Sequence, residues 1–217
     1  MSEPKPVIVA THNAHKVGEI ARTLEPLVGS TIELRTYDGP EPVEDGDTFE
    51  ANALIKARAA FAHTGIPSLA DDSGIVVAAL GGAPGIYSAR YSEEGTDEAN
   101  RAKLLSKMDG IEDRSARFVC VVALVTADGE DIVRGEWAGE LADTVRGDGG
   151  FGYDPLFIPA GETRTAAEFA PLEKAALSHR ARALGAIAPK LLARVVGMPV
   201  VRPATQESAA DASNVDQ

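Results

Sequence analysis

Two long apolar segments on either side of Asp128-Gly129 constrain the fold more than any other feature of the sequence. The first, residues 115–126, reads SARFVCVVALVT, and the second, residues 130–141, reads EDIVRGEWAGEL. The dipeptide Asp-Gly between two segments of this kind is typical of the tight turn in a β-hairpin. We therefore predict an antiparallel hairpin centred on Asp128-Gly129.

Strands and helices alternate in the part of the chain before this hairpin. Apolar residues recur at helical spacing over residues 17–28, and residues 47–65 also have the pattern of a helix. Short apolar segments that predict strands lie at residues 6–10, 31–37, 67–70 and 74–80. Further helices are expected over residues 96–108 and 165–196. Alternation followed by a hairpin favours an α/β fold with a mixed sheet.

Composition limits the class of protein and its partners. The chain has 217 residues, of which 33 are acidic and 21 basic, giving a net charge of -12. This balance argues against a broad nucleic-acid-binding face. No signal peptide or membrane-spanning run is recognised, so we expect a cytoplasmic protein that does not contact membranes. The length suits one large domain or one domain with two lobes over residues 1–201, and the small polar residues at 202–217 predict a disordered tail.

The adjacent carboxylates of Asp71 and Asp72 follow an apolar strand segment and suggest chemistry. Two such groups at the end of a strand are suited to Mg²⁺, which prefers oxygen ligands and would offset their mutual repulsion. A carboxylate not fully committed to a metal can accept a proton from water. The alternative is a turn in which one aspartate bonds its own backbone. Glu44 and Asp45, in an acidic loop, offer a further ligand or plain surface charge.

The loop THNAHK, residues 11–16, lies between the first strand and the first helix, where backbone N–H groups favour an anion. Thr11 and Asn13 can donate hydrogen bonds to a phosphate, and Lys16 supplies charge. The alternative is that Thr11 or Asn13 caps the helix. His12 and His15 have no third ligand nearby, so a metal pair is the weaker interpretation.

A glycine-rich loop, residues 147–154, holds a G-x-G-x-x-G pattern, but Pro155 follows and no helix opens there. We therefore reject a dinucleotide site. Phe151 and Tyr153 offer an aromatic face for a flat base, or pack in the core. Basic groups that would help to bind an anionic ligand are Lys56, Lys174, His179 and Arg180.

The order of these motifs resembles the inosine triphosphate pyrophosphatase family over about residues 7–192. The segments that carry the resemblance are THNAHK, TFEANALIKA, LADDSG, LGGAPGIYSARYS, GGFGYDPLF and SHR. The resemblance implies Mg²⁺-dependent hydrolysis of noncanonical purine nucleoside triphosphates (ITP, dITP and XTP) to a monophosphate and diphosphate. It also implies a long twisted mixed sheet flanked by helices, two lobes with a central nucleotide-binding cleft, and a homodimer.

The resemblance assigns roles to individual residues. Asp72 matches the catalytic acid-base position and a metal ligand, and Glu44 matches a second metal ligand, although its loop reads VEDG where an EETG-like sequence is expected. Asp71, Lys16 and Lys56 are further candidates for the catalytic group. The residues that match substrate contacts are Thr11, His12, Asn13, Ala14, His15, Lys16, Lys56, Ser73, Phe151, Gly152, Tyr153, Asp154, Lys174, His179 and Arg180.

Other functions remain open from the sequence. A pyrophosphatase for modified pyrimidine triphosphates would use the same carboxylates and lysines. A nucleotide sensor on the same scaffold would bind without turnover, and a purely structural interaction protein would hydrolyse no triphosphate. Which of the two aspartates takes the proton from water is likewise open.

Overall fold

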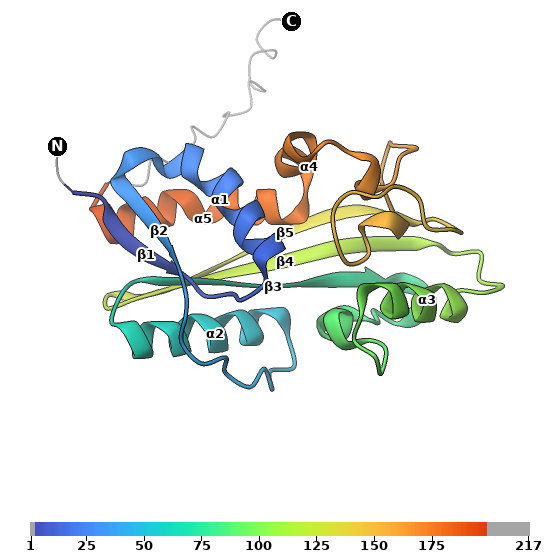
Figure 1. Ribbon diagram of the computed structural model, residues 1–217, viewed down its shortest axis with the longest axis horizontal. Coiled ribbons are helices and arrows are strands. Elements are labelled where there is room, and N and C mark those ends of the chain that lie inside the picture. The colour runs from blue at the N-terminus through green and yellow to red at the C-terminus, as the bar shows by residue number, and fades with distance from the viewer. Residues whose placement is uncertain (1–2, 199–217) are drawn as a thin grey trace, which may run out of the picture.

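The computed structural model describes residues 3–198 of the chain, and these form a mixed sheet flanked by helices (Figure 1). The strand order of this six-stranded sheet is β2-β1-β3-β4-β5-β6. The strands are β1 (Lys5–Val9), β2 (Ile32–Thr36), β3 (Ser68–Val77), β4 (Ser115–Thr126), β5 (Gly129–Leu141) and β6 (Phe157–Pro159). The α-helices are α1 (Ala14–Val28), α2 (Phe49–Thr64), α3 (Asp97–Lys107), α4 (Pro171–Leu177) and α5 (His179–Leu191).

The long hairpin expected from the sequence is confirmed and forms the centre of the sheet. Strands β4 and β5 pair antiparallel from Ser115↔Glu140 to Thr126↔Gly129. β3 pairs antiparallel with β4, and β6 pairs antiparallel with β5, whereas β1 runs parallel to both β2 and β3. The α/β class with a mixed sheet is therefore confirmed.

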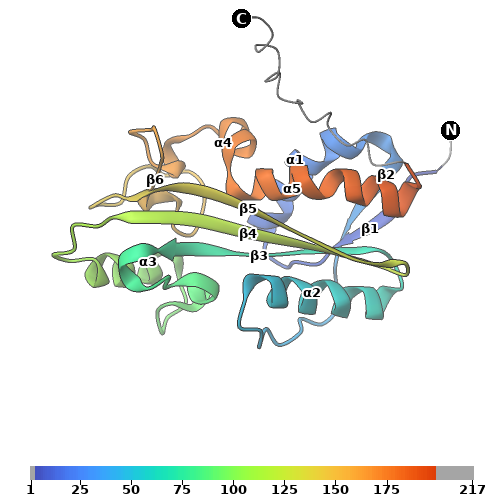
Figure 2. The same ribbon diagram turned by 180° about the vertical axis from the view of Figure 1, so that it is seen from behind.

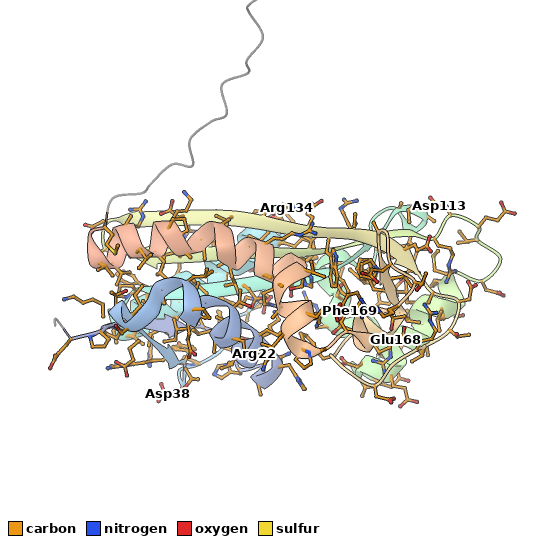
Figure 3. The ribbon with its side chains drawn as sticks, turned by 90° about the horizontal axis from the view of Figure 1, so that it is seen from above. Arg22, Asp38, Asp113, Arg134, Glu168 and Phe169 are labelled. Carbon is orange, nitrogen blue, oxygen red and sulfur yellow. The ribbon has the colours of Figure 1, made fainter. Side chains whose placement is uncertain are left out.

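Helices cover both faces of the sheet. Figures 1 and 2 show α1, α4 and α5 on one side and α2 and α3 on the other, and Figure 3 shows α1 and α5 side by side over the sheet. Successive side chains of a strand point to opposite faces. Accordingly Leu69, Cys120 and Val122 pack beneath α1 and α5, whereas Ala70 and Val121 pack against α2.

The two aspartates do not lie at the end of a strand, and this expectation was wrong. β3 continues without a break from Ser68 to Val77, so the expected separate strands at 67–70 and 74–80 are one strand that includes the pair. Asp71 and Asp72 each pair in register with β4, opposite Val122 and Val121. The two charged side chains interrupt the apolar pattern of the sequence, but the backbone hydrogen bonds between β3 and β4 continue past them.

One edge of β3 is left open over much of its length, and this defines where a ligand can enter. β1 pairs with β3 only at Ile8↔Ser68 and Val9↔Leu69. Beyond Leu69, the only strand-type contact described on that edge is an isolated bridge between Val76 and Pro84. The segment that contains Asp72, Ser73 and Gly74 therefore faces a gap in the sheet.

The predictions of a disordered tail and of no membrane contact concern different parts of the chain. The predicted tail, residues 202–217, lies outside residues 3–198. Within those residues, none of the helices combines the length and apolar character needed to cross a bilayer.

Candidate active site

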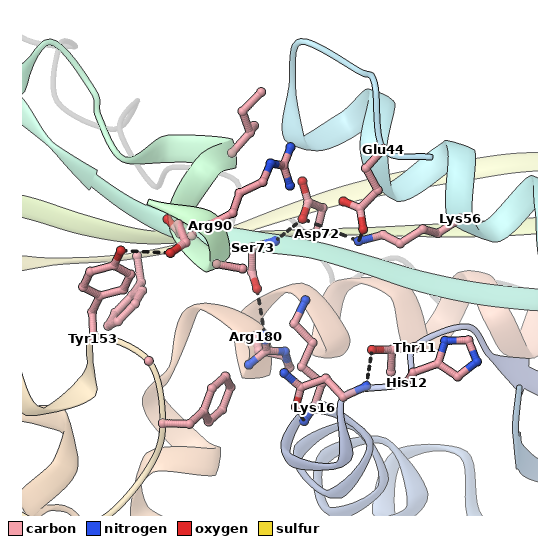
Figure 4. A pocket seen from close by; sticks show the side chains of 18 of the residues that line it. Thr11, His12, Lys16, Glu44, Lys56, Asp72, Ser73, Arg90, Tyr153 and Arg180 are labelled. Carbon is pink, nitrogen blue, oxygen red and sulfur yellow. Dashed lines mark hydrogen bonds and ion pairs between the residues drawn. The ribbon is translucent and has the colours of Figure 1, made fainter. Parts of the chain in front are cut away.

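A cleft of about 330 Å³ lies at the open edge of β3. Its lining comes from the loop before α1, the acidic loop before α2, the middle of β3, the turn formed by residues 150–154 and the junction of α4 and α5. We call residues 150–154 the Phe151 turn. In Figure 4, Asp72 and Ser73 lie between Tyr153 on one side and Lys56 and Thr11 on the other.

Asp71 and Asp72 point to opposite faces of the sheet, because they are consecutive residues of one strand. Asp71 contacts Lys16 of α1 and Arg180 of α5. Asp72 instead contacts residues of α2 and lines the cleft. The expectation that one metal ion offsets repulsion between the pair therefore does not fit this arrangement.

Asp71 is a buried anion held by cations from two helices. Arg180 donates to its Oδ2 from both Nε (3.3 Å) and Nη2 (3.1 Å), and Lys16 Nζ lies 3.2 Å from the same oxygen. Burial by itself would raise the pKa of Asp71, but Lys16 and Arg180 outweigh it and hold that pKa well below its usual range. Asp71 is thus ionised and committed to internal partners.

Asp72 has the opposite electrostatic character. Its Oδ2 accepts from the Asn52 side-chain amide at 3.2 Å, and its Oδ1 accepts from the Ser73 N–H at 3.0 Å. Lys56 Nζ lies 3.5 Å from Oδ1. Burial raises the pKa of Asp72, and the nearby lysines offset only part of this effect. Of the pair, Asp72 is the carboxylate that lines the cleft and has a raised proton affinity.

Glu44 and Asp72 both contact the ammonium group of Lys56. Lys56 Nζ lies 3.2 Å from Glu44 Oε1 as well as 3.5 Å from Asp72 Oδ1. Two hard carboxylates facing one positive charge form a donor set of the kind Mg²⁺ prefers. Residues 3–198 hold no group of three or more His, Cys, Asp or Glu side chains suited to a metal. The chain therefore offers a pair of ligands that leaves room for waters and phosphate oxygens.

The loop at residues 11–16 caps a helix and also lines the cleft. Asn13 is the N-cap of α1, and its Oδ1 accepts from the N–H groups of His15 and Lys16. Thr11, His12, Asn13 and Lys16 line the cleft, whereas Ala14 and His15 are absent from its lining. His12 Nδ1 lies 2.7 Å from Glu41 Oε1, which joins this loop to the acidic loop. Both interpretations of Asn13, cap and cleft residue, are therefore consistent with the structure.

Aromatic and charged groups from the Phe151 turn and α4 form another wall of the cleft, next to the start of α1. The Phe151 ring stacks on His15, with centroids 5.4 Å apart, and Lys174 Nζ lies 5.0 Å from its centre. Lys174 also pairs with Asp154 at 2.6 Å. Tyr153 is only 4% exposed and packs in the core of this half, so its ring is mainly structural.

His179 and Arg180 begin α5, with Ser178 as the N-cap. The His179 ring stacks on Phe118 at 4.7 Å, and its Nδ1 is buried without a partner among the described atoms. Burial, followed by Arg180 and Lys174, holds the pKa of His179 well below its usual value, so the ring is neutral. Arg180 also donates to Ser73 Oγ at 2.8 Å and pairs with Glu19.

Cys120 plays no part in this chemistry. It is a fully buried residue of β4, next to β3 in the sheet, with Sγ 3.8 Å from Asp71 Oδ2. Burial, with the Asp71 charge, raises the pKa of Cys120 to about 12, so the thiol does not ionise. Cys120 therefore packs as a small buried hydrophobe.

Sequence reasoning placed most of the cleft but missed part of it. Asp71, named as a catalytic candidate, lies behind the cleft and holds Lys16 and Arg180 from there. Asn52 carried a usable signal, since it lies four residues before Lys56 on one helix face. Ile86, Ser88, Ala89 and Arg90 also line the cleft and belong to the motif LGGAPGIYSARYS, although no role was assigned to them. Lining residues outside the motifs include Tyr37, Glu41, Pro42, Asp97 and Phe118.

Comparisons with known proteins find relatives over most of the chain. The chain is 50% identical over 198 residues to a protein of Mycobacterium tuberculosis named dITP/XTP pyrophosphatase, covering 88% of this chain and 97% of that protein. It is 52% identical over 191 residues to a protein of the same name from Leifsonia xyli, covering 86% and 96%.

Solved structures with the same fold lead to the same family. A structure from Mycobacterium abscessus, described as nucleoside-triphosphatase / dITP/XTP pyrophosphatase, matches with a TM-score of 0.69 at 47% identity, covering 85% of this chain and 99% of that one. The Ham1 protein of Staphylococcus aureus matches with a TM-score of 0.77 at 36% identity, covering 86% and 98%. The model of the Ham1 family matches residues 7–190. The family resemblance drawn from the motifs is confirmed, and the chain belongs to the Ham1 family.

Proposed function

We propose that this protein hydrolyses noncanonical purine nucleoside triphosphates, namely ITP, dITP and XTP, to the nucleoside monophosphate and diphosphate. The observation that carries the proposal is the position of Asp72, which lies at the open edge of β3 between lysines and an aromatic turn. The names of relatives that share half of its residues over most of the chain support the same activity.

The substrate lies along the cleft with its phosphates at the α1 end. Lys16, Lys56 and the N-terminus of α1 attract negative charge there. The flat base stacks at the other end, on Phe151. The α-phosphate, which joins the nucleoside to the remaining phosphates, then lies beside Asp72 and Ser73.

Asp72 is the group that takes the proton from water. Asp71 is already committed to Arg180 and Lys16 and has a strongly lowered pKa, so it is a poor base. Asp72 has a raised pKa and lines the cleft, as general-base catalysis requires. Lys16 and Lys56 stabilise the charge that spreads over the phosphate oxygens.

Glu44 and Asp72 are the residues that would hold Mg²⁺ in this cleft. When bound, the ion supplies charge neutralisation at the phosphates. The Lys56 ammonium lies between the two carboxylates, and this contact supports the proposal of a cation at that position. Following the family resemblance, we further propose that the protein is a cytoplasmic homodimer whose single two-lobed domain spans residues 1–201.

Base selection follows from which hydrogen-bonding groups are still free. Arg180 is largely occupied by Asp71, Glu19 and Ser73. Lys174 donates to Glu19 and Asp154 and keeps a third N–H, and Nδ1 of the neutral His179 has no partner among the described atoms. A 6-oxo purine accepts a hydrogen bond at O6, whereas the 6-amino group of adenine leaves such a donor unpaired, which is costly in a closed site.

The proposal is tested by measuring diphosphate release from ITP, XTP, GTP, ATP and dTTP, with and without Mg²⁺. We expect Mg²⁺-dependent release with kcat/KM for ITP and XTP at least about 100-fold above that for ATP, as expected when a buried donor is left unpaired. Greater activity on dTTP would indicate a pyrimidine enzyme. Binding of ITP without release would indicate a sensor, and either result would contradict the proposal.

A further inference from the structure

Helix α3 holds the backbone of Gly152 at both of its polar groups. The Gly152 N–H donates to Asp97 Oδ2 at 2.6 Å, and Arg101 Nη1 donates to the Gly152 carbonyl at 2.7 Å. Asp97 and Arg101 are four residues apart, so they share one face of α3. Residues some fifty positions apart in sequence thus meet at one glycine of the Phe151 turn.

Side-chain packing does not hold the backbone of Gly152 in place. The hydrogen bonds from Asp97 and Arg101 therefore fix its conformation. Gly152 has φ +59°, a left-handed conformation, and a Cβ added there would meet no atom within 4 Å. The following residue is held independently, because the Tyr153 hydroxyl donates to the Ser88 carbonyl at 2.9 Å. The preceding N–H, that of Phe151, donates to Asp154 Oδ2 within the turn.

The orientation of the Phe151 side chain depends on the backbone conformation of Gly152. Its ring faces the cleft, against His15 and 5.8 Å from the Arg180 guanidinium. Stacking on an aromatic ring is sensitive to the offset and tilt of the two planes. A small rotation of the Gly152 backbone would therefore change how Phe151 meets a base.

We propose that Asp97 and Arg101 are positioning residues for nucleobase binding, which fix Gly152 and through it the Phe151 ring. The proposal rests on the proposed function, because it assigns the Phe151 turn to the base. Asp97 acts as a hydrogen-bond acceptor in this role, and its charge is incidental. Removing either Asp97 or Arg101 should therefore weaken binding of the base and leave binding of the phosphates unchanged.

The test compares binding of IMP, which carries a base, with binding of diphosphate, which does not. Both are titrated calorimetrically into the wild-type protein and into Asp97→Ala and Arg101→Met. We expect the Kd for IMP to rise by up to about tenfold in each variant, the upper range for loss of one intramolecular hydrogen bond, and the Kd for diphosphate to stay the same. In turnover, KM for ITP should rise while kcat changes little.

Two further variants separate positioning from a general effect on α3. Asp97→Asn keeps an acceptor for the Gly152 N–H and should restore IMP binding to the wild-type value. Glu98→Ala removes the neighbouring exposed acid from the same helical turn and should leave both ligands unaffected.

Each contrary outcome overturns the proposal in a recognisable way. Unchanged IMP binding in Asp97→Ala, or equal weakening of IMP and diphosphate, would show that the contact does not position the base. Failure of Asp97→Asn to restore binding would show that charge, not geometry, matters. A wild-type protein that binds diphosphate but not IMP would overturn the proposed function as well.

Discussion

At the scale of single residues, Asp71 and Asp72 have different roles because strand geometry sends them to different faces. Asp71 is surrounded by Lys16 and Arg180, which lower its pKa despite burial. Asp72 has Lys56 at 3.5 Å and keeps a raised pKa. The same residue type is therefore a fixed counter-ion at one position, and at the next it has the raised pKa that suits the proposed role of proton acceptor.

Substituting Asp72 separates binding from turnover. In Asp72→Asn the side chain keeps its size but loses its basicity, so we expect kcat for ITP to fall about 1,000-fold, within the range for loss of a general base. Nucleotide binding should survive, as measured by titration of ITP into the inactive variant. Retained turnover in Asp72→Asn would rule out the role assigned to this carboxylate.

The matched substitution Asp71→Asn should act mainly on stability. It leaves Arg180 and Lys16 buried without their anion, which costs about 3–5 kcal/mol when a buried pair loses one partner. Urea unfolding of the two variants measures the contrast. Equal unfolding free energies for Asp71→Asn and Asp72→Asn would contradict the assignment of Asp71 as the structural anion.

His179 makes the stability of the fold depend on pH. Its pKa lies well below 6.5 in the folded protein, chiefly because of burial. Below about pH 6.5 the unfolded chain takes up a proton at His179 that the folded protein does not, so stability falls as the pH falls. Between pH 6.5 and about 5.5 the wild-type protein should lose about 1 kcal/mol more unfolding free energy than His179→Phe.

Denaturant unfolding at the two pH values checks this prediction. The variant keeps an aromatic ring against Phe118, so packing is largely preserved. Identical pH slopes for the two proteins would show that His179 is protonated in the folded state.

At the scale of elements, α5 is set close to β5 because a glycine allows it. A Cβ on Gly135 of β5 would lie 2.2 Å from the His179 carbonyl oxygen and 2.6 Å from the Ala183 nitrogen. This close approach places His179 and Arg180, at the start of α5, against β3 and the cleft. The close packing of α5 on β5 therefore also determines where His179 and Arg180 lie in the cleft.

Adding a methyl group at Gly135 should shift α5 away from the sheet. We expect Gly135→Ala to lower the unfolding free energy by about 2 kcal/mol, as overpacking typically does, and to raise KM for ITP. Gly185→Ala is the matched control, because a Cβ there meets nothing within 4 Å and alanine favours a helix by up to about 1 kcal/mol. Equal stability of the two variants in urea would contradict the close packing of α5.

The elements could be predicted from the sequence to a large extent, but their junctions could not. Hydrophobic periodicity located the hairpin and the helices, because most of their stabilisation comes from apolar faces. The continuity of β3 through Asp71 was missed, because the cation that makes its burial possible lies 109 positions away. Asp97 and Arg101 were missed for a similar reason: they contact backbone atoms, which leave no pattern in the sequence.

At the scale of the whole molecule, the cleft joins two halves that share the same long strands. Strand β4 contributes Cys120 and Val122 to the core beneath α1 and α5, and Ala116 and Phe118 to the core beside α3. The phosphate-side loops belong to the first half and the Phe151 turn to the second (Figure 1). Asp72 lies where the halves meet, and in the proposed substrate position it is beside the bond that links the nucleoside to its phosphates.

The position of attack follows from this arrangement and is the central claim of the account. Hydrolysis of ITP in ¹⁸O-labelled water, followed by mass spectrometry of the products, identifies the phosphorus atom that the water attacks. Because Asp72 lies between the base end and the phosphate end of the cleft, the label should be found in the monophosphate, with unlabelled diphosphate released. Label in the diphosphate, or release of labelled orthophosphate, would contradict the account.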